Sequence, residues 1–196
     1  WKNQTLHTLG HIISNLSATE KLKTILDVAC GIGRAYPLCR AAGLSYAGID
    51  RTPAMVARAS ELYPGLDFRV ASAEDIPYET GAFDLVMCND LLIHLTDPLP
   101  VVKELRRVTK RACIFGVPYV LNEVHASGPH IDNGYAVVGR DERAILNAIY
   151  SLHGITTLVS KFFDGVYRFT LVPEDVPSHP TGYHKYRYFV GVVGGK

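Results

Sequence analysis

Residues 25–34, Ile-Leu-Asp-Val-Ala-Cys-Gly-Ile-Gly-Arg, constrain the fold of this chain more than any other stretch. The first four are mostly apolar, which is typical of a buried parallel strand. Glycines follow at positions 31 and 33, and because glycine lacks a Cβ, the backbone there can take positive φ and a ligand can approach the main chain. A helix predicted over 34–42 would direct its first N–H groups toward that ligand. The stretch predicts a nucleotide-binding turn.

The segments after this turn alternate between strand and helix patterns. Strands are predicted at 46–49, 68–70, 83–88 and 112–117, and helices over 53–62 and 98–108, with a short helical turn at 91–95. This alternation predicts an α/β fold with a doubly wound, parallel sheet. An amphipathic helix is predicted before it, over 4–16.

The pattern changes after residue 117. A long polar loop is predicted over 121–138, a helix over 141–152, and strands over 155–163 and 186–193, with a hairpin at 167–172 between them. Two late strands with no helix between them predict an antiparallel pair at the end of the sheet.

Composition narrows the classes of partner. The 196 residues are 47% hydrophobic and 20% charged with a net charge of +1, as in one ordinary globular domain without a basic field for nucleic acid or an anionic membrane. No apolar run approaches the ~20 residues that cross a bilayer, and no signal-peptide pattern opens the chain. The four cysteines show no Cys-x-x-Cys or zinc-like spacing, so we expect no metal site and a reducing, cytoplasmic setting.

Six short motifs occur in order between residues 25 and 117. They are Asp27-Val28-Ala29-Cys30-Gly31-Ile32-Gly33, Gly48-Ile49-Asp50, Pro53-Ala54-Met55, Ala73-Glu74-Asp75-Ile76-Pro77-Tyr78, Gly81-Ala82-Phe83-Asp84-Leu85-Val86 and Leu92-Ile93-His94-Leu95-Thr96-Asp97-Pro98. Together they closely resemble the signatures of class I S-adenosylmethionine-dependent methyltransferases, of the methyltransferase type 11 kind. The resemblance implies a mostly parallel, seven-stranded Rossmann-like sheet with an antiparallel last strand. It also implies one domain over 1–196, with a helical cap (1–22), a cofactor-binding core (25–117) and a substrate-loop and C-terminal strand region (118–196).

The same resemblance implies a set of residues that bind S-adenosyl-L-methionine. These are Ala29, Cys30, Gly31 and Gly33 under the cofactor, Asp50 at the ribose, Arg51, Met55, Ser72, Ala73 and Glu74 at the adenine, and Asn89 near the methionyl group. The role of Asp50 also follows from its place at the tip of the second strand, where a carboxylate accepts from both sugar hydroxyls.

Two positions depart from the family pattern. Ala29 stands where the first glycine is usual, and Ser72 stands where aspartate often binds the adenine amino group. Adenine recognition is thereby left to the Ala73 backbone, with Ser72 Oγ or Glu74 as further candidates, and we expect a lower affinity.

A dinucleotide is the rival ligand for the turn. Its fingerprint needs a small third residue so that helix and strand pack closely. Counting from Gly31 places Tyr36 there, and counting from Ala29 places Arg34 there. Neither residue is small, which disfavours a hydride-transfer enzyme.

The catalytic residues and the acceptor are less constrained. His94 and His125 are weak candidates for a general base, and Asp90, four residues before His94, would lie close enough to orient its imidazole. Packing is the favoured alternative for His94. Weak candidates for acceptor binding lie on or near the 121–138 loop: Tyr119, Asn122, His130 and Tyr135. Ordinary surface positions explain the loop histidines equally well.

The sequence therefore predicts a methyltransferase acting in line on a small-molecule acceptor. The reacting O, N, S or C atom and the oligomeric state stay open. The family's Asn-Pro-Pro-Tyr motif is replaced by Asn89-Asp90-Leu91-Leu92, which together with the low net charge disfavours a nucleic-acid substrate. The alternative is a non-catalytic S-adenosylmethionine-binding or regulatory protein with the same fold.

Overall fold

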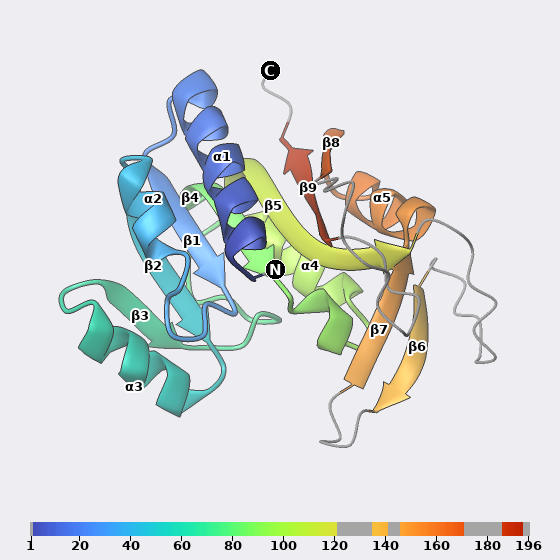
Figure 1. Cartoon of the computed structure of the whole chain (residues 1–196), viewed down its shortest axis with the longest axis horizontal. Helices are drawn as coiled ribbons and strands as arrows, with labels where there is room; N and C mark the ends of the chain where they lie inside the picture. The colour runs from blue at the N-terminus through green and yellow to red at the C-terminus, as the bar shows by residue number, and fades with distance from the viewer. Residues whose placement is uncertain (1, 121–134, 141–145, 171–185, 194–196) are drawn as a thin grey trace.

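The computed structural model of the chain describes residues 2–120, 135–140, 146–170 and 186–193. A mixed sheet runs through these residues, and helices cover it (Figure 1). Its first five strands are parallel neighbours in the order β3-β2-β1-β4-β5. They are β1 (Thr24–Val28), β2 (Ser45–Asp50), β3 (Asp67–Val70), β4 (Phe83–Asn89) and β5 (Thr109–Val120). This order confirms the predicted doubly wound sheet.

The far edge of the sheet carries the antiparallel strand that the family resemblance implied. Strand β9 (Tyr186–Val192) pairs antiparallel with β5 and also with β8 (Gly165–Thr170), so that β8 runs parallel to β5. The order β3-β2-β1-β4-β5-β9-β8 gives the seven expected strands with one reversed. A further hairpin, β6 (Tyr135–Arg140) and β7 (Leu146–Ser151), pairs with the end of β5. It lies at the opposite side of the molecule from β3 (Figure 1).

Two apolar layers hold the helices to the sheet. Strand side chains alternate between the faces, since neighbours along a strand point to opposite sides. On one face, Leu9 and Ile13 of α1 (Lys2–Glu20) and Cys39 of α2 (Tyr36–Ala41) pack with strand residues such as Ile25. On the other face lie α4 (Leu99–Val108) and α5 (Leu152–Ser160). Helix α3 (Pro53–Leu62) connects β2 to β3.

The N-terminal helix is confirmed and is longer than predicted. Ser17 Oγ donates to the Ala42 carbonyl at 3.0 Å, and a Cβ added at Gly10 would lie 3.2 Å from Leu38 Cδ2. Helix α1 therefore packs closely on α2. Among the described residues, no helix has the length and apolar character required to cross a membrane.

Four predictions for the C-terminal part are wrong. Residues 155–163 were expected as a strand, but most of them lie in α5, where Ile155, Leu158 and Val159 are buried at helical spacing. The run is rich in β-branched residues, and packing of this stripe on the sheet overrides that local preference.

The second error concerns 141–152, which was expected as a helix. Residues 146–151 form β7, because β6 on one side and β5 on the other provide main-chain partners for it. The third is the polar loop over 121–138, whose last residues begin β6. The predicted hairpin at 167–172 overlaps strand β8 instead. Residues 121–134, 141–145 and 171–172 of these predictions lie outside the described part.

Candidate functional site

The strand order places a topological switch point between β1 and β4. From β1 the chain proceeds outward through β2 and β3, and from β4 it proceeds the other way to β5. Ligands of open α/β sheets bind beyond the carboxyl ends of the strands at such a point. Val28 is in register with both Ile49 and Cys88, so that the residues following these three, Ala29, Asp50 and Asn89, meet at one level. The sheet thus brings together three of the predicted binding residues.

The glycine turn, residues 29–33, has the left-handed backbone that its sequence predicted. φ is +62° at Ala29, +55° at Gly31 and +77° at Gly33. The Cys30 N–H donates to the Ile49 carbonyl at 3.0 Å, which ties the turn to β2. A Cβ added at Gly31 would meet no atom within 4 Å, so the space above the turn is open. Ala29 accepts the strained conformation that glycine usually takes, at a cost of roughly 1 kcal/mol.

The Asp50 carboxylate closes over this turn. Oδ2 accepts the Gly31 N–H at 2.9 Å, and Oδ1 accepts the Thr52 N–H at 2.9 Å. A carboxylate has about four acceptor positions, of which these bonds use two. The carboxylate is therefore fixed in place and can still accept from the two hydroxyls of a ribose.

A buried acid for which the sequence indicated no role lies on β1, two residues before the turn. Asp27 on β1 is 4% exposed and accepts a hydrogen bond from the Tyr46 hydroxyl of β2 at 2.7 Å. Burial raises the pKa of Asp27 to about 7, although the Tyr46 hydrogen bond opposes the rise. Its sequence signal was an acidic residue in an otherwise apolar strand. This bond links β1 to β2 two residues before the turn begins.

The turn lies close to β2 because Cys30 packs over Gly48, which has no side chain. A Cβ at Gly48 would lie 2.9 Å from Cys30 Sγ and 2.9 Å from Phe68 Cδ1. Cys30 is buried, and this burial raises the pKa of its thiol well above the ordinary value. The thiol is therefore a packing group in its protonated form. All four cysteines are buried and free.

The loop over residues 71–82, between β3 and β4, borders the candidate site on another side. The Ala71 N–H donates to the Asp50 carbonyl at 3.1 Å, which fixes the start of the loop beside the turn. Ser72 Oγ accepts the Glu74 N–H at 3.2 Å and so shapes the chain locally. Ala73 donates its N–H to no residue that the structure describes, which leaves this donor for a ligand. Ser72 and Glu74 are exposed, as are Arg51 and Met55 near the start of α3.

Asn89 carries the most direct sign of a missing partner. Its Oδ1 is buried and has no hydrogen-bond partner among the described residues, while Nδ2 lies 3.9 Å from Met87 Sδ. A buried polar atom without a partner costs about 1–3 kcal/mol, and native structures hold few of them. An ammonium or hydroxyl donor bound beyond β4 would satisfy this oxygen.

Asp90 and His94 come close together after β4, as their spacing predicted. Asp90 takes φ +59°, and its N–H donates to the Gly116 carbonyl at 2.9 Å. Although part of Asp90 is open to solvent, crowding by protein raises the pKa of its carboxyl to about 6, and the nearby His94 lowers it in part. His94 is exposed on the short helix η1 (Leu92–His94), so the predicted packing role is not supported by burial.

The remaining acceptor candidates are only partly placed. Tyr119 and Tyr135 belong to β5 and β6, and the register sets each opposite Tyr150 of β7. Asn122, His125 and His130 lie outside the described residues. Within the described part, no three His, Cys, Asp or Glu side chains gather as a metal site requires.

Tyr36 supports the exclusion of a dinucleotide. Its ring packs edge-on against Tyr46 at 5.4 Å and Tyr63 at 4.8 Å between centroids. The interface between α2 and β2 is thus filled by aromatic rings, where a pyrophosphate-binding fold needs close contact through a small residue.

Comparison with known proteins agrees with this geometry. Residues 26–116 match a family model described as "Methyltransferase domain". This segment is therefore similar to the methyltransferase family, which agrees with the resemblance seen in its motifs. The matched span runs from β1 to β5 and includes the glycine turn, Asp50, the 71–82 loop and Asn89.

Named methyltransferases are similar to the chain over about 45% of its length. Ubiquinone biosynthesis O-methyltransferase of Pseudomonas paraeruginosa is 39% identical over 93 residues, covering 45% of this chain and 40% of that protein. Chloroplastic tocopherol O-methyltransferase of Arabidopsis thaliana is 38% identical over 96 residues, covering 45% and 28%. The match thus spans less than half the length of these curated relatives.

Solved structures resemble the fold over nearly the whole chain. A putative sarcosine dimethylglycine methyltransferase from Galdieria sulphuraria has a TM-score of 0.71 at 16% identity, covering 94% of this chain and 85% of that one. Magnesium protoporphyrin IX methyltransferase from Synechocystis, solved with bound S-adenosylmethionine, has a TM-score of 0.63 at 18% identity, covering 96% and 79%. At these identities the likeness establishes the fold.

Proposed function

We propose that the chain is an S-adenosylmethionine-dependent methyltransferase that acts on a small-molecule acceptor. The observation that carries the proposal is the convergence of three groups at the ends of β2, β1 and β4. These are the fixed Asp50 carboxylate, the open glycine turn and the unpartnered Asn89 Oδ1. The match of residues 26–116 to a methyltransferase family model supports it.

The described residues fit the parts of this cofactor. Asp50 would accept the ribose hydroxyls, the Ala73 N–H would donate to the adenine, and Asn89 Oδ1 would accept from the methionyl ammonium. The backbone of Ala29, Cys30, Gly31 and Gly33 would form the floor, while Arg51, Met55, Ser72 and Glu74 would border the adenine. When bound, S-adenosylmethionine supplies a methyl group activated on a sulfonium sulfur.

Both named relatives are O-methyltransferases, which favours a hydroxyl as the acceptor group. A hydroxyl acceptor needs a base to take its proton, and His94 with the neighbouring Asp90 is the candidate in the described part. Asp90 would hold the imidazole in orientation, and the exposed position of His94 gives an acceptor access to it. Transfer itself requires the nucleophile in line and in a site from which water is excluded.

We further propose that residues 1–196 act as one methyltransferase unit. Helix α1 packs on α2, the helix that follows the glycine turn, and β8 and β9 extend the same sheet beyond β5. The helical cap predicted over 1–22, through α1, would then brace the turn from the α2 side. Acceptor contacts would come from the 118–196 region, which includes Tyr119, Asn122, His130 and Tyr135.

Calorimetric titration with S-adenosylhomocysteine tests the cofactor assignment. We expect binding by the wild type and a loss of about 1–3 kcal/mol in Asp50→Ala, because both ribose hydroxyls lose their acceptor. Glu61→Ala, which removes an exposed carboxylate paired with Arg58 on α3, is the matched control and should bind normally. No binding by folded wild type at millimolar ligand would contradict the proposed function.

Methyl transfer is tested separately with radiolabelled S-adenosylmethionine and a panel of small phenols, amines and thiols. We expect label on a phenolic acceptor and its loss in His94→Ala. Cofactor binding with no transfer to any acceptor would favour the non-catalytic alternative.

A further inference from the structure

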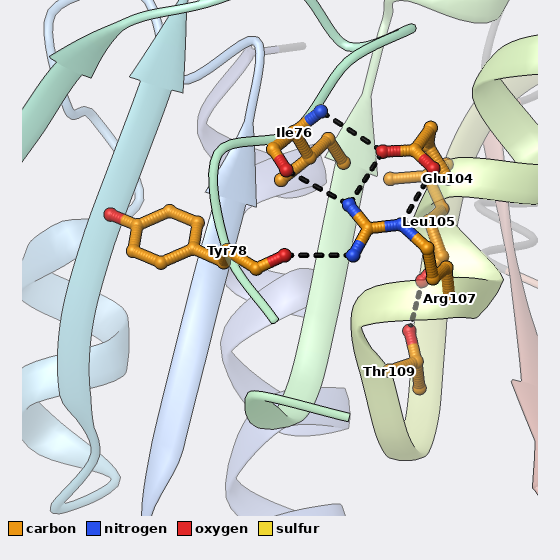
Figure 2. Close-up of polar contacts among 6 residues, drawn as sticks. All are labelled: Ile76, Tyr78, Glu104, Leu105, Arg107 and Thr109. Atoms are coloured by element: carbon orange, nitrogen blue, oxygen red, sulfur yellow. Dashed lines mark hydrogen bonds and ion pairs between the residues drawn. The ribbon is translucent and has the colours of Figure 1, made fainter. Parts of the chain in front are cut away.

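We propose that Glu104 and Arg107 of α4 are positioning residues for the adenine side of the site. Neither would touch the cofactor. They hold the 71–82 loop, and the loop in turn presents the Ala73 N–H; the inference rests on the proposed function. Figure 2 shows the two side chains facing the loop from α4.

One ion pair satisfies three main-chain groups of the loop. Arg107 binds Glu104 through two bonds, Nε to Oε1 at 2.6 Å and Nη2 to Oε2 at 2.7 Å. Arg107 also donates from Nη1 to the Tyr78 carbonyl at 2.7 Å and from Nη2 to the Ile76 carbonyl at 2.9 Å (Figure 2). Glu104 Oε2 accepts the Ile76 N–H at 3.0 Å. The pair therefore supplies main-chain groups of the loop with hydrogen bonds of the kind that a neighbouring strand supplies within a sheet.

The position of Ala73 follows from anchors on both sides of it. Before it, the Ala71 N–H is bound to Asp50, the proposed ribose ligand. After it, Ile76 is buried and bound to Glu104 and Arg107, and the Gly81 N–H donates to the Arg107 carbonyl at 2.8 Å. The few residues between these anchors include the Ser72–Glu74 turn. Loosening the later anchor would move the Ala73 N–H relative to Asp50.

The chemistry of the pair makes arginine specifically suited to position 107. The side chains of Arg107 and Glu104 are 32% and 17% exposed, so solvent screens their attraction only in part. Arg107 lowers the pKa of Glu104 below its ordinary value, which keeps the carboxylate ionised. A lysine would keep the charge but lose the planar fork that reaches Glu104 and two carbonyls together.

Arg107→Lys and Glu104→Gln test the inference, with Arg106→Lys as the matched control. Arg106 lies on the same helix but donates from Nε to the Phe162 carbonyl at 2.9 Å, away from the loop. We would measure affinities for S-adenosylhomocysteine and S-inosylhomocysteine by calorimetry, and amide hydrogen exchange over 71–79 by mass spectrometry. Inosine probes the loop because its base carries a hydrogen at N1, where adenine presents an acceptor to an N–H donor.

We expect Arg107→Lys and Glu104→Gln to bind S-adenosylhomocysteine about tenfold more weakly, the scale of one lost charge-assisted bond. Their preference for the adenine ligand over the inosine ligand should fall, and loop amides should exchange faster. Arg106→Lys should match the wild type in all three readouts.

Two results would overturn the inference alone. One is an unchanged preference for the adenine ligand over the inosine ligand in both variants, that is, equal weakening toward both ligands, which indicates a general structural role. The other is unchanged loop exchange. Failure of the wild type to bind S-adenosylhomocysteine would overturn the proposed function and this inference with it.

Discussion

The glycine turn and the 71–82 loop form two walls of the same candidate site but are held by different forces. The turn is fixed mainly by main-chain hydrogen bonds, by positive φ at Gly31 and Gly33, and by the buried Asp27–Tyr46 pair on the neighbouring strands, with the Asp50 carboxylate accepting the Gly31 N–H. The loop is fixed by partly exposed, ionised side chains from α4 and β3. One wall is set by steric fit and burial, and the other by charge.

This difference predicts how each wall responds to change. Steric fit around a buried turn leaves little room for adjustment, because packed interiors resist added volume. Charge-assisted bonds near the surface are individually weaker and are screened by solvent. We therefore expect single substitutions near the turn to cost more stability than those on the exposed side of the loop.

The largest effect is expected for Gly48→Ala on the turn side. The added Cβ would lie 2.9 Å from Cys30 Sγ and from Phe68 Cδ1, which forces both side chains to move. We expect the free energy of unfolding to fall by about 1–3 kcal/mol, measured by urea denaturation. The reference variant is Ala54→Gly, in the exposed first turn of α3. Gly65→Ala is unsuitable as a reference because φ at Gly65 is +85°. If Gly48→Ala were as stable as the wild type, steric fit would not be what holds the turn.

The second-largest effect is expected for Asp27→Asn, which should change how the free energy of unfolding depends on pH. Because the folded-state pKa of Asp27 is raised to about 7, the native protein keeps its proton at pH 5 while the unfolded chain is ionised. Between pH 5 and 7 the unfolded chain therefore binds fewer protons than the native state, so that a rise in pH lowers stability until the native Asp27 also ionises. The asparagine does not titrate, so its stability relative to the wild type should increase by roughly 2 kcal/mol from pH 5 to 8.

Asp84→Asn provides the control of opposite sign. Burial raises the pKa of Asp84, but the N–H groups of Lys23 and Thr24 outweigh this and hold the pKa below its ordinary value. Its contribution is present at neutral pH and is lost as pH falls toward 3. Denaturation curves at pH 5 and 8 that show no added benefit of Asp27→Asn at pH 8 would contradict the buried-acid description of the turn.

The smallest effect is expected for Tyr78→Phe on the exposed side of the loop. The Tyr78 hydroxyl donates to Asp67 Oδ2 at 2.8 Å, but the Asp67 and Arg69 side chains are 44% and 46% exposed. Phenylalanine keeps the ring under Arg69 and against Phe83. We expect a loss of about 0.5 kcal/mol or less in the free energy of unfolding. A loss as large as that of Gly48→Ala would remove the distinction between the two walls.

Much of the site was predictable because its signals are local. A strand followed by Gly31 and Gly33 specifies a left-handed turn, and Asp50 at the next strand tip specifies an acceptor beside it. The C-terminal part was less predictable, because residues 146–160 fit either helix or strand by pattern, and only their partners in the sheet decided between them. The hydrogen bond from Tyr46 to Asp27 was not predictable either, because it depends on β1 and β2 lying side by side.

By itself, the sequence determined the order of strands and helices from β1 to β5, the glycine turn and the resemblance of residues 26–116 to methyltransferases, since all depend on short-range patterns and side-chain identity. Only the tertiary structure decided that Tyr46 binds Asp27 beside the turn and that α4 side chains hold the 71–82 loop. Arg107 lies 29 and 31 residues along the chain from Tyr78 and Ile76, and no local pattern announces a bond across such a separation. Such contacts exist because packing α4 against the sheet brings its ionised side chains to main-chain groups that have no strand partner.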